Sequence, residues 1–483
     1  MVLRVTFLAC ALLLWVCAGA DSIWDYQEVR ASDGLGIHPL VDADPEPWNR
    51  VTIEGVALAG VDEILDPALM YTIFVQDDTS DRGGIQVWAG SWWYGGLWRP
   101  SEYVDFQAGD RVRVTGLLAN HNGKVFINDR HSPAPQTRFV VEVLGHAGMP
   151  DPWLIPSIGS CNYFDATRVG GGERYQTRWV MLHGVEITGG TWGNNQLLTI
   201  TDSTGSVGML LAGPGDFGSY LQPTGKLNVV GIFDQEDATL PYFDDYRVWV
   251  KRRADIAAAL DWCNQVQQVG AGEQVALVGK LVVQSGPNDF TIEDDTGQVV
   301  VVSDHPVAAG DVVAVQGSVT PEGIEARYVT VLPVPDVVLT ASVTLDSYAP
   351  GPDGVPVDLW VYDVTAGGDL VGSYQVILDT NGQFTQDLGI KRGTGREYRV
   401  RAKSSHWLAT DFSFTAGGDQ LVTWQFVNGD ADGDNQIGLG DLNRMLLSFA
   451  RTDDPDADVD GDGSVGLGDL NVALINFAKT GAP

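Results

Sequence analysis

Two copies of one acidic loop lie near the end of this chain, in residues 428–479, and they constrain its fold more than any other stretch. The copies begin at Asp430 and Asp458. Each carries aspartates at loop positions 1, 3, 5 and 12, which are Asp430, Asp432, Asp434 and Asp441 in the first copy and Asp458, Asp460, Asp462 and Asp469 in the second. A hard cation such as Ca²⁺ takes about six to eight oxygen ligands, and this alternation wraps one loop around one ion. The segment is therefore predicted to bind two calcium ions.

The other loop positions suit the same ion. Position 6 must turn sharply, and it holds Asn435 and Gly463, which both tolerate a positive φ. Position 7 supplies a backbone carbonyl as a further ligand, and here that carbonyl belongs to Gln436 or Ser464.

A helix is predicted after each loop. Apolar residues recur there at the spacing i, i+3, i+4, i+7, as Leu442, Met445, Leu446 and Phe449 and again as Leu470, Ala473, Leu474 and Phe477. Ile437 and Val465, at loop position 8, are expected to point inward and to couple the two loops. The alternative is a solvated acidic tail, but such tails do not carry helical apolar stripes.

The segment 428–483 resembles a type I dockerin. Like a dockerin, it has Asp rather than Glu at position 12, and no helix precedes either loop, because residues 422–427 read as a strand. The resemblance implies that two Ca²⁺ ions fold the module and that its helices dock onto a cohesin-like partner. The family's partner-contact positions fall here on Leu439, Gly440, Leu447 and Arg451, and on Leu467, Gly468, Ile475 and Lys479. The common dockerin pattern has hydroxyl residues where both copies have Leu-Gly.

Acidic residues outnumber basic ones by 63 to 29, which gives a formal net charge of −34. This excess disfavours nucleic acid as a ligand, because phosphate contacts need a basic face. Residues 1–20 read as a secretory signal, with Arg4, an apolar core and small residues before Asp21. No later run approaches the roughly 18 apolar residues of a membrane span. We therefore expect a secreted or cell-surface protein without a membrane span.

A unit of short strands occurs three times between Trp48 and Leu332. Its first strand alternates in polarity and ends in glycine, as VTIEG (51–55), VMLHG (180–184) and VALVG (275–279). Alternation of period two with closely spaced turns predicts antiparallel β-structure, and glycines at the bends suit a small closed barrel. The order of strands and turns resembles OB-fold modules of exported bacterial proteins. The predicted OB-like barrels cover 48–146, 175–256 and 269–333.

Acidic turns follow the second strand of each unit, at Asp77-Asp78, Asp202 and Asp294-Asp295. Their side chains are predicted to accept hydrogen bonds from turn amides, which is the usual role of Asp in such places, rather than to bind a metal.

The other segments are shorter or more irregular. An irregular leader (21–47) precedes the first barrel, a Pro/Gly-rich linker (147–174) follows it, and a helical linker (257–268) joins the second barrel to the third. Residues 336–427 resemble a carboxypeptidase-regulatory-like or Ig-like β-sandwich, with Asn381-Gly382 as a hairpin turn. The fold class is thus mainly β: three small OB-like barrels, one sandwich and a C-terminal two-helix dockerin with paired loop-helix repeats similar to EF-hands.

The first barrel carries an aromatic insertion, whose rings are Trp92, Trp93, Tyr94 and Trp98. Such rings stack on sugars or on bases, and the net charge favours a glycan as the ligand. The alternative is a cap that folds its rings over the barrel mouth.

Cys161 and Cys263 are the only cysteines after the predicted signal. An exported protein can form disulfides, so we consider a Cys161–Cys263 bridge, with two buried free thiols as the alternative.

No catalytic constellation stands out, since the chain has no histidine pair at zinc-site helical spacing and no G-x-S-x-G elbow. We lean towards a non-catalytic binding or scaffold protein attached through its dockerin. The alternative is a glycan-binding or hydrolytic accessory of an extracellular polysaccharide-degrading system, because the carboxylate pair of a glycoside hydrolase can come from distant strands. A nucleic-acid-binding OB-fold protein is the second alternative.

Overall fold

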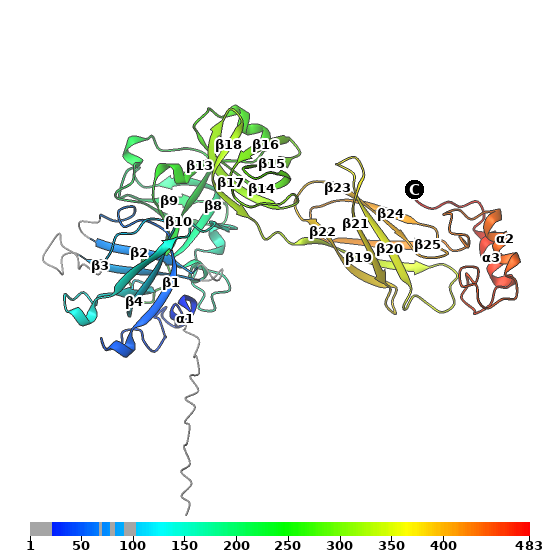
Figure 1. Ribbon diagram of the computed structural model, residues 1–483, viewed down its shortest axis with the longest axis horizontal. Coiled ribbons are helices and arrows are strands. Elements are labelled where there is room, and N and C mark those ends of the chain that lie inside the picture. The colour runs from blue at the N-terminus through cyan, green and yellow to red at the C-terminus, as the bar shows by residue number, and fades with distance from the viewer. Residues whose placement is uncertain (1–21, 67–69, 78–82, 91–102) are drawn as a thin grey trace, which may run out of the picture. The chain divides into compact units, whose positions relative to one another are not determined.

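The computed structural model describes residues 22–66, 70–77, 83–90 and 103–483, and the chain it shows is mainly β, as predicted (Figure 1). The chain forms two compact units. One comprises Met1–Ala259 with Gln274–Ala276, and the other comprises Leu260–Glu273 with Leu277–Pro483. The predicted signal, residues 1–20, lies outside the described residues. Among the described helices, none combines the length and apolar character that crossing a membrane requires.

Three closed sheets of five strands share one strand order, in which the third strand pairs with the fifth and the fourth closes onto the first. Barrel 1 contains β1 (Val51–Ala57), β2 (Met70–Gln76), β3 (Gly84–Gly90), β4 (Asp110–His121) and β5 (Lys124–Asn128), with β6 (Val140–His146) added to β4. Barrel 2 contains β8 (Arg178–Gly189), β9 (Leu197–Thr201), β10 (Ser206–Leu211), β11 (Leu227–Gln235) and β12 (Tyr246–Val250), with β7 (Trp153–Ile155) beside β8. Barrel 3 contains β14 (Gln274–Ser285), β15 (Asp289–Asp294), β16 (Gly297–Val302), β17 (Val312–Thr320) and β18 (Gly323–Val331).

Side-chain alternation and glycine explain why these sheets close. In β3, Ile85 and Val87 face the core of barrel 1, so Gln86 and Trp88 project from its outer face. The fourth strand of barrels 2 and 3 contains a glycine where the fifth strand passes closely. A Cβ on Gly231 would collide with the carbonyl oxygen of Trp249, and one on Gly317 would collide with that of Glu325.

Asp202 and Asp294 act as predicted, and Asp78 lies outside the described residues. Asp202 Oδ1 accepts hydrogen bonds from the amides of Thr204 (2.6 Å) and Gly205 (3.0 Å), and Asp294 Oδ1 accepts one from Thr296 (2.9 Å). The other oxygen of each carboxylate binds the segment that precedes the barrel, through the amides of Ile158 and Cys263, both at 2.8 Å.

The predicted Cys161–Cys263 disulfide is wrong, because both cysteines are free and buried. The amide of Cys263 bonds to the turn aspartate of barrel 3 as the amide of Ile158 bonds to that of barrel 2. The residue that matches Cys263 is therefore Ile158, and Cys161 lies three residues after it. Its thiol donates to the carbonyl of Ile158 within its own short helix, over 3.4 Å. Burial raises the pKa of both thiols to about 12.

The N-terminal leader, which was predicted to be irregular, packs against barrel 1. It forms α1 (Ile23–Tyr26), and both Ile23 and Tyr26 are buried in the core of barrel 1. Gln27 then donates from Nε2 to the carbonyls of Gly84 (3.0 Å) and Val125 (2.8 Å). The leader therefore satisfies backbone groups of β3 and β5 and belongs to the barrel.

The predicted helical linker 257–268 is also wrong over its first half. Residues 256–260 form β13 (Ile256–Leu260), which pairs with β11, and only Cys263–Gln268 is helical, as a 3₁₀ turn. Alanine-rich sequence favours a helix in isolation. Here Ile256 is buried and the neighbouring backbone bonds to an available strand, and that tertiary pairing outweighs local propensity.

Seven further strands form two sheets with one shared core. One sheet contains β19 (Asp336–Leu345), β22 (Gln383–Lys391) and β25 (Gln420–Phe426), and the other contains β20 (Pro356–Asp363), β21 (Asp369–Ile377), β23 (Glu397–Lys403) and β24 (Thr410–Thr415). The chain then ends in α2 (Leu439–Leu447) and α3 (Leu467–Ile475).

A buried polar network joins barrels 1 and 2 within the first unit. Lys124 on β5 forms ion pairs with Asp234 on β11 and with Glu236, the latter at 2.6 Å. Lys251 Nζ donates to the carbonyl of Leu58 (3.0 Å), and Gln76 accepts from the amide of Trp179 (2.8 Å). The two barrels therefore share hydrogen bonds that water cannot replace.

We expect Lys124→Met to destabilise the first unit by about 3–5 kcal/mol, because it leaves the buried Asp234 and the partly buried Glu236 without their counter-charge. Differential scanning calorimetry of the full chain measures this as a lowered transition temperature. Arg113→Met is the matched control. It removes solvent-screened pairs with Glu54 and Glu142 in the same barrel and should lower the transition temperature much less. Equal shifts for both variants would contradict a buried junction.

Candidate metal centre

Most of the aspartates that the sequence predicted as ligands lie close together in the two acidic loops. Oxygens of Asp430, Asp432 and Asp441 lie within 4.8 Å of one another, and so do those of Asp458, Asp460 and Asp462. The remaining two predicted aspartate ligands, Asp434 and Asp469, stand in the loops but outside these groups.

Backbone amides hold the carboxylates in the same pattern in both loops. Asp430 accepts from the amide of Asn435 at 3.2 Å, and its counterpart Asp458 accepts from Gly463 at 3.0 Å. The aspartates at positions 3 and 5 of each loop accept hydrogen bonds from the backbone amide two residues further along the chain. These bonds measure 2.8–3.2 Å and join Asp432 to Asp434, Asp434 to Gln436, Asp460 to Asp462 and Asp462 to Ser464. Position 6 has a positive φ in both loops, +67° at Asn435 and +95° at Gly463, as expected.

The aspartate at position 12 links each loop to its helix. Asp441 accepts from the amide of Asp432 (3.0 Å) with one oxygen and from that of Gly438 (2.7 Å) with the other. Asp469 repeats both bonds. A carboxylate in the first turn of a helix also interacts favourably with the helix dipole. The short Asp side chain is therefore used to fix the loop against the helix N-terminus.

Position 8 couples the loops crosswise. Ile437 and Val465 are both buried in the core of the module. Ile437 exchanges backbone hydrogen bonds with Ala478 and Lys479, which follow α3, and Val465 does so with residues that follow α2. Each loop is thus closed by the end of the other repeat's helix.

The donor set fits a hard divalent cation. Burial, with the neighbouring carboxylates, raises the pKa of Asp432, Asp458 and Asp460. Asp458 Oδ1 is buried and has no hydrogen-bond partner among the described residues. Clustered, partly desolvated carboxylates of this kind are stabilised when an ion balances their charge. The loops would supply oxygen ligands to Ca²⁺, and the ion would offset the repulsion between the neighbouring carboxylates.

Within the described ranges, the sandwich supplies a cation to the first loop and none to the second. Lys403, the last residue of β23, places Nζ 2.7 Å from Oδ2 of Asp430, whose side chain is fully buried. The first loop also donates the amide of Asp430 to the carbonyl of His406 (2.9 Å), and Asn435 Oδ1 accepts from the amide of Ala409 (2.7 Å). Sequence reasoning missed Lys403, because it lies 27 residues before its partner and nothing local marks it.

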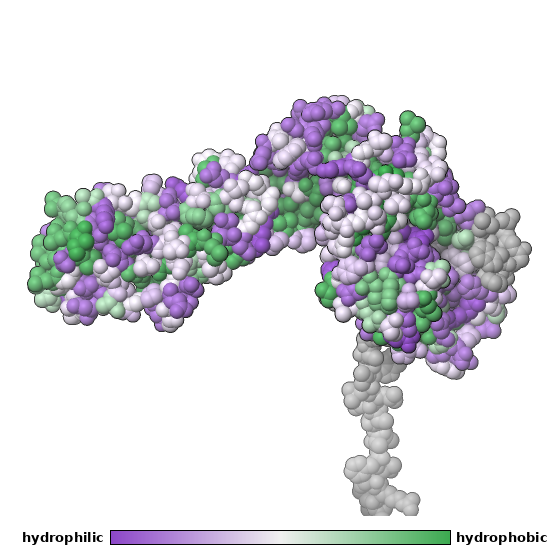
Figure 2. All heavy atoms as spheres, turned by 180° about the vertical axis from the view of Figure 1, so that it is seen from behind, coloured by the Kyte–Doolittle hydropathy of each residue, from purple (hydrophilic) through white to green (hydrophobic). Residues whose placement is uncertain are grey.

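The helices bury only part of their apolar stripe. Met445 and Ala473 are buried and Leu442 and Leu470 are partly buried, but Leu446, Phe449, Leu474 and Phe477 are exposed. The large apolar residues at predicted partner positions are more exposed still, at 76% for Leu439, 75% for Leu447, 75% for Leu467 and 70% for Ile475. Figure 2 shows apolar side chains gathered over this module.

The remaining partner positions differ in character. Arg451 pairs with Asp453 at 2.8 Å, and Lys479 donates to Asn476 at 2.7 Å. Gly440 and Gly468 are exposed, but each also has an internal reason to be glycine. A Cβ there would collide with Oδ2 of the position-3 ligand, Asp432 or Asp460. The aromatic insertion with Trp92, Trp93, Tyr94 and Trp98 lies outside the described residues.

No family model and no curated protein matches the chain. Among solved structures, an interface mutant of a type II cohesin-X-dockerin complex from Acetivibrio cellulolyticus is 19% identical over 30% of this chain and 97% of that chain, with a TM-score of 0.23. The hypothetical protein ygiW from E. coli is 19% identical over 16% of this chain and 89% of its own, with a TM-score of 0.14. A murine DNA-binding protein bound to double-stranded DNA is 12% identical over 41% and 95%, with a TM-score of 0.19. At such low TM-scores these similarities carry no argument about the function of this chain.

We expect Lys403→Met to lower the stability of the C-terminal module by about 3–5 kcal/mol in a calcium chelator, because Asp430 is then buried without a counter-charge. The loss should be much smaller with excess Ca²⁺, which supplies that charge. Thermal unfolding of the full chain in both conditions measures the difference. Lys391→Met, which removes a half-exposed pair with Asp336 on the same sandwich, should change neither condition by more than about 1 kcal/mol. A loss for Lys403→Met that is equal with and without calcium would contradict the role assigned to it.

We expect Gly440→Ser to weaken calcium binding at one of the two sites by about tenfold or more, a change of about 1.4 kcal/mol, because the new side chain displaces Asp432. Calcium titration of the full chain by calorimetry measures it. Gly438→Ser is the matched control, since a Cβ at Gly438 meets nothing within 4 Å and serine suits the N-cap position that Gly438 occupies. Unchanged affinity in Gly440→Ser would show that Asp432 is not a ligand.

Proposed function

We propose that this chain is an exported, non-catalytic binding or scaffold protein that attaches to a cohesin-like partner through a calcium-dependent, dockerin-like C-terminal module. Export is inferred from the signal-like residues 1–20. This attachment would localise the three barrels and the sandwich to a surface or an assembly.

The observation that carries the proposal is the repeated apolar surface on α2 and α3. Leu439 and Leu467 occupy the same loop position, and Leu447 and Ile475 occupy the same helix position. All four are at least 70% exposed. Soluble monomers rarely expose a large contiguous apolar patch, and such patches mark protein interfaces. Because the two halves match, the same surface is offered twice.

Calcium would set the geometry of this surface. The loops fix the helix N-termini through Asp441 and Asp469, and each loop closes onto the end of the other helix. An ion that neutralises the loop carboxylates therefore stabilises the arrangement of both helices at once. Binding and folding are coupled in metal sites of this kind.

We expect the full chain to bind an immobilised type I or type II cohesin domain in calcium and to lose that binding in a chelator. Leu447→Glu with Ile475→Glu should reduce affinity by at least about a hundredfold, roughly 2.7 kcal/mol, because two charges enter the apolar contact. Surface plasmon resonance measures both effects.

Leu421→Glu is the matched control, because Leu421 is 82% exposed but lies on β25 of the sandwich. Calcium titration of the double variant should match that of the unchanged chain, so a loss of docking cannot be ascribed to a lost ion. Binding that persists in chelator, or that survives the double substitution, would refute docking through the helices. Absence of binding to both cohesin classes in calcium would refute the proposed partner.

A further inference from the structure

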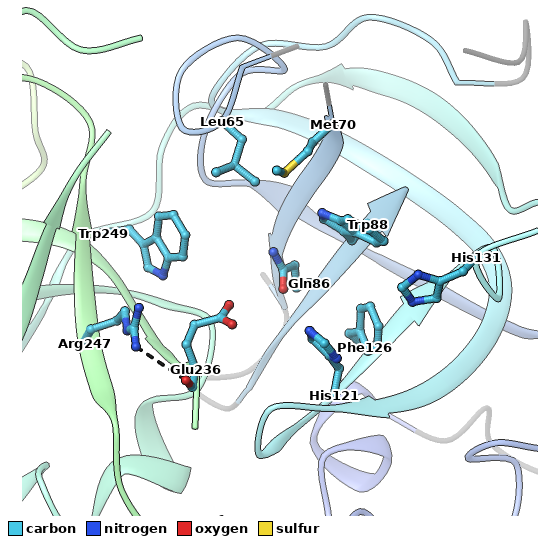
Figure 3. Close-up of a pocket in the computed structure, with 10 residues that line it drawn as sticks. All are labelled: Leu65, Met70, Gln86, Trp88, His121, Phe126, His131, Glu236, Arg247 and Trp249. Atoms are coloured by element: carbon cyan, nitrogen blue, oxygen red, sulfur yellow. Dashed lines mark hydrogen bonds between the residues drawn. The ribbon is translucent and has the colours of Figure 1, made fainter. Parts of the chain in front are cut away.

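A cavity of about 280 Å³ lies between barrels 1 and 2 in the first unit (Figure 3). Barrel 1 contributes Gln86 and Trp88 from β3 and Phe126 from β5. Barrel 2 contributes Trp249 from β12. Nothing in the calcium-dependent docking involves these residues, and the cavity is independent of that proposal.

Strand alternation places these side chains outside both barrel cores. Val87 and Ile127 face the core of barrel 1, so their neighbours Trp88 and Phe126 point the other way. Gln86 and Phe126 are directly opposite in the parallel β3–β5 pair. Trp249 likewise stands between Val248 and Val250, which are fully buried. The cavity is therefore built on the rigid strands of both barrels.

The indole N–H of Trp249 has no hydrogen-bond acceptor among the described residues. The side chain is only 7% exposed, and its Nε1 is buried. Figure 3 shows this nitrogen on the edge of the ring that faces Arg247 and Glu236. A buried indole N–H normally finds an acceptor, so an acceptor atom is expected to enter the cavity from outside the chain.

The charges that line the cavity are already balanced. Glu236 accepts from Lys124 Nζ at 2.6 Å and from Asn122 Nδ2 at 3.0 Å. Arg247 lies 3.7 Å from a carboxylate oxygen of Asp245 and 3.5 Å from the carbonyl oxygen of Glu236. Burial lowers the pKa of His121, which keeps that imidazole neutral at neutral pH. Because the charged groups that line the cavity already pair with other residues, they would not balance the charge of an ionic ligand. The cavity therefore suits a neutral ligand.

The polar groups include both donors and acceptors, set among aromatic rings. Trp249 offers a donor, and Glu236 and the imidazole of His121 offer further polar atoms around Trp88 and Phe126. Hydroxyl groups both donate and accept, so a ring that bears several hydroxyls satisfies such a mixture, while its C–H face packs on an aromatic ring. Ligand cavities usually measure about 300–1,000 Å³, so this one admits a single small ring.

From this geometry we propose that the cavity between barrels 1 and 2 binds one neutral sugar residue. The residue lies with its C–H face against the aromatic side chains, and one of its hydroxyl oxygens accepts from Trp249 Nε1. Gln86 and Glu236 orient the remaining hydroxyls.

Isothermal titration calorimetry of the full chain tests this with a fixed panel. The panel contains glucose, galactose, mannose, xylose, arabinose, fucose, N-acetylglucosamine and their methyl glycosides, with adenosine and cytidine as neutral heteroaromatic competitors. We expect at least one sugar to bind in the micromolar to millimolar range, and neither nucleoside to bind. Tighter binding of the methyl glycoside than of the free sugar would identify the end of a glycan as the source, and the reverse would identify a free monosaccharide.

Trp249→Phe keeps the ring and removes only the N–H, and we expect it to weaken binding about tenfold. Gln86→Leu should also weaken binding, and it decides the matter if Trp249→Phe unfolds. Trp262→Phe, which changes an exposed tryptophan of the second unit, is the matched control and should bind as the unchanged chain does. Binding of no sugar in the panel, binding of a nucleoside alone, or sugar binding that both cavity variants retain in full would each overturn the proposal.

Discussion

The C-terminal module depends on how the charge of its clustered aspartates is balanced. Asp430, Asp432 and Asp441 approach within 4.8 Å of one another, and the second loop repeats this with Asp458, Asp460 and Asp462. Carboxylates this close repel one another unless a cation lies between them. Amide hydrogen bonds orient the oxygens but leave Asp458 Oδ1 without a partner in the described part of the chain. The same carboxylates hold the loops and the helix N-termini, so the charge balance bears on both.

The two loops have the same internal bonds but different surroundings. Lys403 gives the first loop a permanent positive charge, and the carbonyl of His406 and the amide of Ala409 tie that loop to the sandwich. The second loop receives backbone contact from Ala349 at 2.8 Å, but no cation of the described residues pairs with its ligands. The first loop is thus held by the sandwich, and the proposed ion would matter more to the second loop. Lys124 plays the corresponding part in the first unit, where one buried cation joins two barrels through Asp234 and Glu236.

Sequence reasoning reached the features that depend on short, regular spacing. The aspartate positions, the positive φ at Asn435 and Gly463, the turn role of Asp202 and the mainly β character all follow from local patterns. Sequence reasoning missed features that depend on contacts between residues far apart in the chain. Residues 256–260 pair with β11 despite their alanines, and Cys161 does not stand at the position equivalent to Cys263. Periodicity also identified Leu446 and Phe449 as apolar, but it did not reveal that they face outward, because only the packing of the module decides which part of a helix is covered.

The most direct test of this account is the number of calcium ions that the decalcified full chain takes up, measured by titration calorimetry with far-ultraviolet circular dichroism at each step. The account predicts two ions per chain, with helical signal gained as they bind, and one ion per chain when Asp458 and Asp460 are both replaced by alanine. A chain that takes up no calcium, or whose helical signal is complete in its absence, would contradict it.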